Sequence, residues 1–278
     1  MSTKKEEQVK IGGYTFKIIE NSMEYNNTIF SRTFKIGGDY EDCVNLSYTY
    51  SNGVPQTAKL PHLMYEPECA IGKELQRGGG SELMIKTLIK YAHKKIPEVN
   101  IFEFDDMSNI DCVEKDLSKP PPRKPIRPLK LSYFSIAYNG LTWYEKHFNA
   151  KMKDLDKYTK YRERIHFLTD TNSKVEFVRF LEIAKPPLSQ IEQLKLWYES
   201  AKTYREFFNL IPFEDRCIML FSWLDNFMSY YLHDVFTDRY WYIDVRDMDL
   251  KKGGKRQTRK RLYPSKYKLI HYEHIHSF

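Results

Sequence analysis

Hydrophobic and polar residues alternate over residues 44–64, and this alternation predicts a β-hairpin. Val44–Tyr50 alternates apolar and polar side chains, Ser51-Asn52-Gly53 is typical of a tight turn, and Thr57–Met64 returns as a second strand. A further apolar run ends at Cys69-Ala70-Ile71 and has the character of a buried strand. The sequence therefore predicts strands on the N-terminal side of the first helix.

The apolar spacing becomes helical after three consecutive glycines. The positions that recur at helical spacing are Met84, Ile85, Leu88, Ile89 and Ala92. Gly78–Gly80 therefore lies at the N-terminus of a helix, where free N–H groups and the helix dipole attract an anion. Glycine also lets a pyrophosphate approach the backbone closely, and Arg77 adds a positive charge. We interpret Gly78–Gly80 as a phosphate-binding turn, with a plain flexible turn as the alternative.

Regular elements continue beyond this helix, with one long interruption. Val99–Asp105 has the pattern of a strand, and Ala137–Phe148 has the pattern of an aromatic helix. An insertion over residues 107–130 separates them and contains Lys119–Pro128, which is rich in proline and cations. Because proline lacks an N–H group and clashes with the preceding helical turn, we expect an extended loop there.

Two helices and a strand are predicted in the C-terminal part of the chain. Pro186-Pro187 precedes a capping box over Ser189–Glu192, from which a helix is expected to run to Phe208. A second apolar helix is expected over residues 213–235, and Trp241–Val245 has the pattern of a strand. We expect the aromatic side chains of both helices to form a core.

The glycine loop carries a resemblance to a known family. Gln76-Arg77-Gly78-Gly79-Gly80-Ser81 resembles the signature of the GCN5-related N-acetyltransferases (GNAT), in which Gln or Arg, two residues, Gly, one residue and Gly or Ala open a helix. A register shifted by one residue fits nearly as well. Tyr144–Phe148 resembles the closing motif of the family, Tyr-Glu-Lys-x-Gly-Phe, without its glycine. The predicted order of hairpin, strand, glycine loop, helix, strand and aromatic helix agrees too.

This resemblance implies an α+β fold. The central sheet would be GNAT-like, mixed and mainly antiparallel, with flanking helices and a mainly helical C-terminal extension. The expected divisions are a flexible N-terminus (1–10), an acetyltransferase-like domain (11–172, with the insertion 107–130), a helical region (173–250) and a basic aromatic tail (251–278).

The resemblance also implies a reaction, the transfer of an acetyl group from acetyl-CoA to an amine of a protein lysine, a protein N-terminus or a small molecule. The coenzyme diphosphate would rest on the glycine loop, formed by Gln76, Arg77, Gly78, Gly79, Gly80 and Ser81. The backbone of Cys69 and Ile71 would bond the pantetheine, and Tyr144 would protonate the departing thiolate. The attacking ammonium must lose a proton, and Glu66 or Glu68 is the candidate base; ordinary solvated carboxylates are the alternative.

Composition narrows the cellular setting. The chain has 278 residues, 41% of them hydrophobic, and no apolar run approaches the ~20 residues of a membrane helix. Met1–Glu7 is not followed by the apolar segment of a secretory signal. The cysteines are far apart and form no Cys-x-x-Cys pair: Cys43, Cys69, Cys112 and Cys217. We therefore expect reduced thiols, no metal site and a soluble intracellular protein, in the cytoplasm or nucleus of a host.

Positive charge is concentrated near the C-terminus. Lys251–Lys268 holds nine cations and no acid, and subtracting nine from the net charge of +7 leaves −2 for the other residues. Such a run suits nucleic acid phosphates, and it resembles the Gly-Gly-Lys-Arg tails of proteins from large double-stranded DNA viruses. The expected partner is nucleic acid or a virion protein; nuclear import or a solvated tail is the alternative. His271, His274 and His276 are interpreted as exposed histidines of a terminal strand, with metal binding as the alternative.

Two classes of function follow from the sequence. The first is an acetyl-CoA-dependent N-acetyltransferase. The second is a catalytically inactive protein of the same fold, such as a virion or minor capsid component, which contacts partners through its C-terminal region and basic tail. A pure nucleic-acid-binding protein is a third interpretation, based on the tail alone.

Overall fold

The chain folds into two compact units. The computed structural model describes residues 2–26, 28–63, 66–75, 79–106, 108–113, 125–236 and 240–248. Among these, residues 2–102 and 244–248 form the first unit, and residues 103–243 form the second. The division falls after Phe102, whereas the sequence pattern places a boundary at residue 172. The basic tail 251–278 and its histidines lie outside the described residues.

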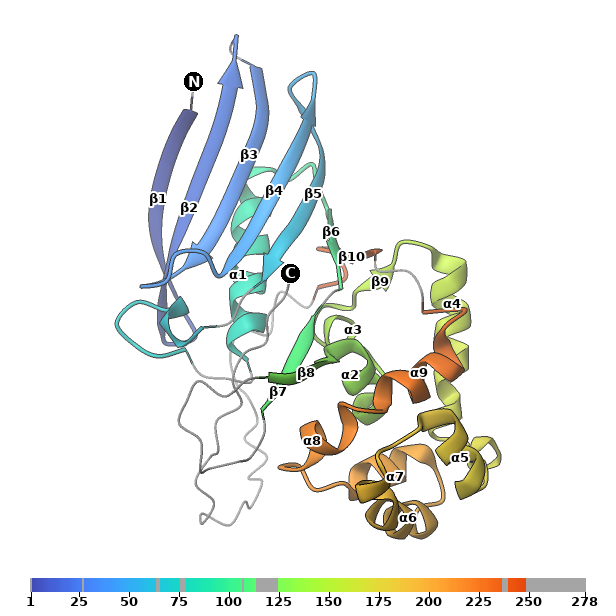
Figure 1. Cartoon of the computed structure of the whole chain (residues 1–278). Coiled ribbons are helices and arrows are strands. Elements are labelled where there is room, and N and C mark those ends of the chain that lie inside the picture. Colours follow the sequence, from blue (N-terminus) through green and yellow to red (C-terminus); the bar gives the residue numbers. More distant parts are fainter. Residues whose placement is uncertain are drawn as a thin grey trace. The chain divides into compact units, whose positions relative to one another are not determined.

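The first unit is built on an antiparallel meander (Figure 1). Its strands follow one another in chain order: β1 (Ser2–Ile11), β2 (Tyr14–Tyr25), β3 (Thr28–Gly37), β4 (Val44–Ser51) and β5 (Val54–Leu63). β6 (Ile101–Asp105) starts beside β5 at the end of this unit. The hairpin predicted over residues 44–64 and the strand near residue 100 are thus confirmed, as is the mainly antiparallel sheet.

The prediction of a flexible N-terminus over residues 1–10 is wrong. Residues 2–11 pair with β2 along their whole length. Gly12 and Gly13 have positive φ angles of 61° and 81° and form the two-residue turn between the strands, a conformation that suits glycine. Nearly all side chains of β1 face solvent, and the strand is mostly polar and charged, so it leaves no hydrophobic pattern in the sequence.

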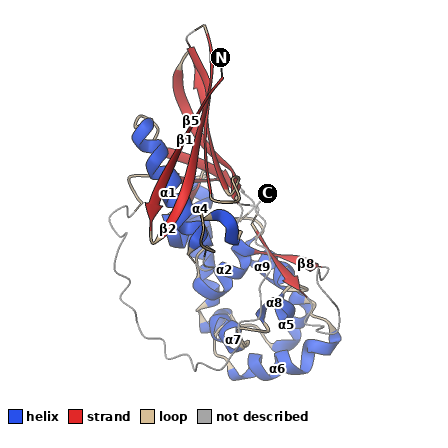
Figure 2. Ribbon diagram, turned by 90° about the vertical axis from the view of Figure 1, so that its left-hand side faces the viewer, coloured by secondary structure: helices blue, strands red, loops and turns tan. Residues whose placement is uncertain are grey.

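One helix covers one face of the meander (Figure 2). α1 (Gly80–Lys95) confirms the helix predicted from the apolar spacing, and its apolar side chains are buried. The sheet contributes alternate residues to the same core: Phe16, Ile18, Phe34, Ile36, Leu46 and Tyr48. Burial of about six such side chains supplies roughly 10 kcal/mol of hydrophobic stabilisation before the entropy of folding is subtracted.

A buried ion pair also lies on the covered face of the sheet. Glu20 is only 5% exposed and stands opposite Phe34 in the β2–β3 register. Its Oε1 accepts a hydrogen bond from Nε of Arg32 at 2.7 Å and a second one from Nη2. Because removal of Arg32 would leave the buried Glu20 carboxylate uncompensated, this pair favours the observed register of the two strands.

The run Cys69-Ala70-Ile71 does not form the predicted strand. Pro67–Cys69 is a 3₁₀ turn, η1, and residues 70–73 bend away from it. Cys69 is bonded to Cys43, which precedes β4, and both side chains are fully buried. The apolar character of this run therefore reflects burial at a covalent anchor and not pairing within the sheet.

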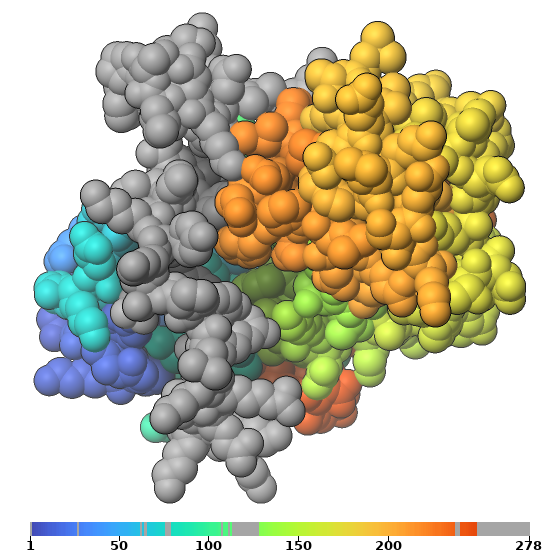
Figure 3. All heavy atoms as spheres, turned by 90° about the horizontal axis from the view of Figure 1, so that it is seen from below, coloured from blue at the N-terminus to red at the C-terminus, as the bar shows by residue number. Residues whose placement is uncertain are grey.

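The second unit is mainly helical, and its helices from residue 155 onward appear yellow to orange in Figure 3. The helices are α2 (Leu131–Asn139), α3 (Trp143–Phe148), α4 (Leu155–Arg164), α5 (Phe177–Ala184), α6 (Ile191–Ser200), α7 (Tyr204–Leu210), α8 (Arg216–Leu220) and α9 (Leu224–Leu232). Two short antiparallel pairs complete the unit: β7 (Asn109–Val113) with β8 (Pro125–Lys130), and β9 (Lys151–Met152) with β10 (Tyr240–Asp244). The helical C-terminal part and the strand near residue 241 are thus confirmed.

Long helices predicted from apolar spacing are divided in this unit. The helix expected over residues 137–148 is two helices, because Gly140 ends α2 in the left-handed conformation and the Thr142 side chain caps α3. The helix expected up to Phe208 ends at Ser200, and Thr203 caps α7. Ser189 lies in a 3₁₀ turn and provides no cap. Apolar periodicity carries across these breaks because both helices of each pair face the same core.

The proline-rich insertion is only partly described. Residues 114–124 lie outside the described part of the chain, whereas Pro125–Pro128 belongs to β8. β8 pairs only with β7 in its two-stranded sheet, where strand edges tolerate the missing N–H groups. The prediction of a loop up to residue 128 is therefore wrong at its end.

Aromatic side chains form the core of the second unit, as predicted. Those that are completely buried include Phe180, Tyr204, Phe207, Phe208, Trp223 and Phe227. The Trp223 ring stacks on Phe208 with 6.1 Å between ring centres.

Among the described helices of the protein, none is both long enough and apolar enough to cross a membrane.

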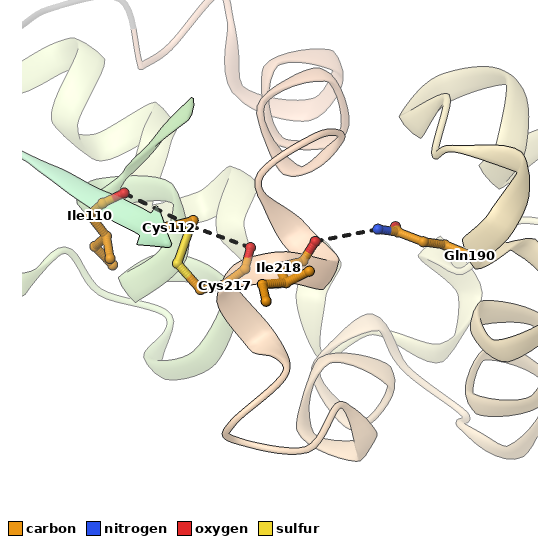
Figure 4. The surroundings of a disulfide bond; sticks show 5 residues. All are labelled: Ile110, Cys112, Gln190, Cys217 and Ile218. Atoms are coloured by element: carbon orange, nitrogen blue, oxygen red, sulfur yellow. Dashed lines mark hydrogen bonds between the residues drawn. A yellow bond between two sulfur atoms is a disulfide. The ribbon is translucent and has the colours of Figure 1, made fainter. Parts of the chain in front are cut away.

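A second disulfide joins β7 to α8 (Figure 4). Cys112 and Cys217 are 105 residues apart in sequence, and their Cα atoms lie 5.4 Å apart. The neighbouring Ile218 carbonyl accepts a hydrogen bond from Nε2 of Gln190 at 3.3 Å, which connects α8 to the start of α6. With both bonds formed, none of the four cysteines is free. The prediction of reduced thiols is wrong, because sequence spacing does not reveal which cysteines the fold brings together.

We predict that the two disulfides stabilise the protein to different extents. Closing a 105-residue loop constrains the unfolded chain more than closing a 26-residue loop. The double substitution Cys112→Ser with Cys217→Ser should lower the free energy of unfolding by about 5 kcal/mol, and the Cys43→Ser, Cys69→Ser pair by about 3.5 kcal/mol. Denaturant unfolding measures both, and alkylation of the unreduced wild type should label no cysteine. Four labelled cysteines would contradict the disulfides.

Candidate functional site

The glycine loop leads directly into α1. Gly79 is the N-cap residue and Gly80 the first helical residue, so the prediction of a helix N-terminus at the glycines is confirmed. The first intrahelical bond joins the Leu83 amide to the Gly79 carbonyl at 3.0 Å. Gln76, Arg77 and Gly78 lie outside the described residues. The amides of Gly80 and Ser81, in the first turn, are thus the described part of the expected anion site.

Packing also requires glycine at this position. A Cβ atom at Gly80 would lie 2.6 Å from Cγ of Leu75, whose side chain is buried. Glu82 in the first turn of α1 places a carboxylate near the positive end of the helix dipole and pairs with Lys86 at 2.6 Å. Close packing on Leu75 therefore accounts for Gly80 without a ligand, while phosphate binding remains chemically compatible with the free amides.

The backbone expected to bond pantetheine is already engaged. The Cys69 amide donates to the Glu66 carbonyl at 3.1 Å, and the Ile71 amide donates to the Thr15 carbonyl at 2.8 Å. Two further contacts hold this segment: Leu75 N–H to Pro67 carbonyl at 2.8 Å, and Gly72 N–H to Asp39 Oδ2 at 3.1 Å. The amides of Cys69 and Ile71 therefore do not fit the role that the resemblance gives them.

The two candidate bases do not share a strand face. Glu66 is the N-cap residue of η1, where its side chain and that of Cys69 form a reciprocal capping pair. Glu68 lies one residue into the turn and is exposed, and its carbonyl accepts the Tyr40 amide at 2.9 Å. Residues two apart in a 3₁₀ turn point in different directions. Solvated or capping carboxylates are therefore the better description of both.

The second unit contains a polar cluster that the sequence analysis reached only through Tyr144. This tyrosine lies on α3 and is 6% exposed. Its hydroxyl lies 3.3 Å from Oγ of Ser108, and its ring centre lies 4.3 Å from that of Phe104. Burial raises the pKa of the Tyr144 hydroxyl, and the charge of nearby Asp106 raises it further. The hydroxyl is thus a protonated donor at neutral pH.

Asp106 completes this cluster. It follows β6 directly, and its Oδ1 accepts the Ser108 amide at 3.3 Å. Burial raises the pKa of Asp106 from 3.8 to about 6, with the charge of Glu145 adding to the effect and the Ser108 hydrogen bonds opposing it. A carboxyl group with this pKa exchanges its proton near neutral pH, as a general base or acid must. In the sequence, the acidic pair Asp105-Asp106 at the end of a predicted strand is the pattern that could have indicated this cluster.

Glu145, next to Tyr144, has a structural role. It is buried and completes the capping box of α3, accepting the Thr142 amide at 2.7 Å. Its carboxylate also accepts bonds from the Tyr158 hydroxyl at 3.1 Å and the Tyr161 hydroxyl at 2.8 Å. Arg162 pairs with it at 3.3 Å. These contacts tie α3 to α4 and thereby fix the helix that carries Tyr144.

The predicted site residues lie in different units of the structure. Tyr144 lies in the second unit, together with Asp106 and Ser108. Every other described candidate belongs to the first unit: Glu66, Glu68, Cys69, Ile71, Gly79, Gly80 and Ser81. No group of three or more His, Cys, Asp or Glu side chains suited to a metal ion occurs within the described residues. The cluster Asp106–Ser108–Tyr144 is therefore the best candidate for chemistry.

We predict a pH-dependent stability signature for Asp106. The folded protein binds the Asp106 proton more tightly than the unfolded chain, because the pKa rises from 3.8 to about 6. The stability from the neutral carboxyl is present below the unfolded pKa and is lost as pH rises through 6. Asp106→Asn avoids this loss, so its free energy of unfolding relative to wild type should increase by about 2 kcal/mol between about pH 4 and pH 7.5.

Chemical denaturation at both pH values measures this difference. Asp105→Asn is the matched control for the substitution itself, since Asp105 is the neighbouring residue and is exposed. A pH-independent result for Asp106→Asn would show that the carboxyl titrates normally.

Comparisons of the chain with models of protein families, with curated proteins and with solved structures find no match. The resemblance to the GNAT family therefore stays a hypothesis that depends on the motif residues themselves.

Proposed function

We propose that the protein is an N-acetyltransferase that uses acetyl-CoA to acetylate an amine, either a protein lysine, a protein N-terminus or a small amine. The observation that carries the proposal is the contact of Asp106, Ser108 and Tyr144 at the end of β6. A carboxyl group with a pKa of about 6 can serve as the base of this reaction, and a neutral phenol can serve as its acid.

The chemistry assigns one proton transfer to each residue. Asp106 in its carboxylate form takes a proton from the incoming ammonium, whose ordinary pKa is near 10.4. The free amine forms a bond to the thioester carbon, the carbon–sulfur bond breaks, and Tyr144 protonates the departing thiolate. The nitrogen of the new amide releases its remaining extra proton to solvent. Ser108 hydrogen-bonds to both residues, so it is placed to pass the proton from Asp106 back to Tyr144.

Within the first unit, the described features that agree with the proposal are α1 and its N-cap residue Gly79. A hairpin, α1 and a strand follow one another there, as the family resemblance implies, but the strand that the resemblance places before the glycine loop is replaced by the 3₁₀ turn η1. Taken by itself, the first turn of this helix is suited to a diphosphate through the amides of Gly80 and Ser81. The pantetheine contacts expected at Cys69 and Ile71 are not part of the proposal, because those amides are already bonded.

A second candidate function is a non-catalytic structural protein, such as a virion or minor capsid component. Three observations favour it: Leu75 fills the space beside Gly80, Tyr144 is nearly inaccessible, and each unit is locked by a disulfide. Disulfides persist in oxidising settings and at virion surfaces, so they do not favour the intracellular setting expected from the sequence. Coenzyme binding separates the two functions.

We predict that acetyl-CoA stabilises the protein. At a hundred times its Kd, a ligand that binds only the folded state adds about 2.7 kcal/mol, which should raise Tm by roughly 5 °C. Ser81→Glu should abolish this shift while preserving α1, because a carboxylate in the first turn favours the helix but repels a diphosphate. Ser81→Ala is the control and should keep the shift. An unchanged Tm with wild type would favour the structural function.

We also predict that Tyr144→Phe slows turnover without weakening coenzyme binding. Loss of a general acid should lower kcat by roughly 10²-fold, because a thiolate leaves readily even without protonation. Tyr133→Phe is the matched control, since its hydroxyl contacts Ser229 on α9 at 3.4 Å and takes no part in the cluster. Coenzyme release measured at saturating acetyl-CoA tests the prediction, and equal kcat values for Tyr144→Phe and wild type would exclude the assigned role.

A further inference from the structure

The outer edge of the first unit is a long and regular strand (Figure 1). β1 stands first in the strand order and pairs only with β2, from Ser2 opposite Met23 to Ile11 opposite Tyr14, without a register shift. Every side chain of β1 is exposed except that of Val9, which is half-buried. Within the described residues no strand pairs with its other edge, so a row of N–H and C=O groups there is available to another strand.

The charges along this edge have a self-complementary order. Lys4-Lys5-Glu6-Glu7 places two cations before two acids. When such a strand meets a second copy of itself in antiparallel orientation, the cations of each copy run alongside the acids of the other. A strand with charges of one sign would instead repel its copy in every antiparallel register.

Symmetry defines which side chains face one another. The two-fold axis that relates antiparallel edge strands is perpendicular to the sheet, so directly opposed residues have the same parity and project from the same face. In one register Lys4 opposes Glu6 of the second copy, and this pair occurs twice by symmetry. In the adjacent register Lys5 opposes Glu7 twice. Each register leaves a single like-charged pair on the axis, with opposite charges diagonal to it.

The side chains of Lys4–Glu7 are exposed and can therefore contact a second copy of the strand. Lys4 and Glu6 pair with each other at 2.7 Å on one face, and both are about half exposed. Glu7 accepts a hydrogen bond from the Tyr91 hydroxyl at 2.8 Å on the other face. Lys5 forms no ion pair with any residue that the structure describes, and its side chain is exposed.

We propose that two copies of this chain associate through β1, edge to edge and antiparallel, so that their sheets become continuous. Main-chain hydrogen bonds supply the attraction, and the Lys4–Glu7 charges select a second copy of the same strand. Charged edge strands often serve to prevent association, but that device works through repulsion, which this order of charges removes. A strand edge buries less surface than a standard interface, so the dimer is weak and concentration-dependent.

Charge exchange tests the proposal. One variant carries Lys4→Glu with Lys5→Glu and has an all-acidic edge; the other carries Glu6→Lys with Glu7→Lys and has an all-basic edge. Sedimentation equilibrium should show a monomer–dimer equilibrium for wild type and at least a roughly tenfold weaker dimer for each variant alone, because two attractive pairs become repulsive. An equimolar mixture of the two variants should recover the dimer. Circular dichroism and Tm confirm that each variant is folded.

A control separates this edge from net charge. Lys160→Glu with Lys202→Glu lowers the net charge by as much as the all-acidic variant does, but at exposed lysines of the second unit. It should leave the dimer unchanged. Three outcomes would overturn the proposal: a wild type that stays monomeric at the highest concentration reached, variants that dimerise like wild type, or a mixture that stays monomeric. None of these measurements depends on acetyl-CoA.

Discussion

Burial of carboxylates is the constraint on which the rest of this structure depends. An ionised carboxylate inside a protein needs several donors, and the fold is arranged around how each one obtains them. Glu20 obtains them from Arg32, which fixes β2 against β3. Glu145 obtains them from the cap of α3 and from α4, which fixes the position of α3. Asp106, which is half-buried, obtains them only from Ser108 among the described residues, and desolvation therefore leaves its pKa raised to about 6. The carboxyl with the fewest donors is the one suited to proton transfer.

Some features of the candidate site favour an enzyme, and others favour a structural protein. Asp106 and Tyr144 have the protonation states that acetyl transfer requires, yet the tyrosine hydroxyl is nearly buried. In the first unit, the amides of Gly80 and Ser81 in the first turn of α1 need no intrahelical acceptor, but Leu75 packs on Gly80 and a disulfide anchors Cys69 upstream. An enzyme of this kind would recognise its coenzyme with few contacts beyond the diphosphate. A structural protein would retain the same packing for stability alone.

Sequence periodicity predicts the helices and strands that bury one face in a core, and it predicts few other features of this structure. The alternation over Val44–Tyr50 and the helical spacing before Ala92 gave β4 and α1 because each has one buried face. β1 has no buried face, so its only signal is the glycine pair that follows it. Gly140 breaks a helix without interrupting the apolar pattern. The acidic pair Asp105-Asp106 marks the end of β6 in the sequence, but the raised pKa of Asp106 and the pairing of distant cysteines depend on the complete fold.

The pH dependence of amine acetylation tests the central claim most directly. If Asp106 is the base, kcat/KM for the amine should rise with pH along a limb centred near 6, the pKa that burial gives this carboxyl. In Asp106→Asn that limb should disappear and the remaining rate should follow the ionisation of the amine alone. An unaltered limb in the variant, or no transfer from acetyl-CoA to any amine by a folded and oxidised wild type, would contradict the account.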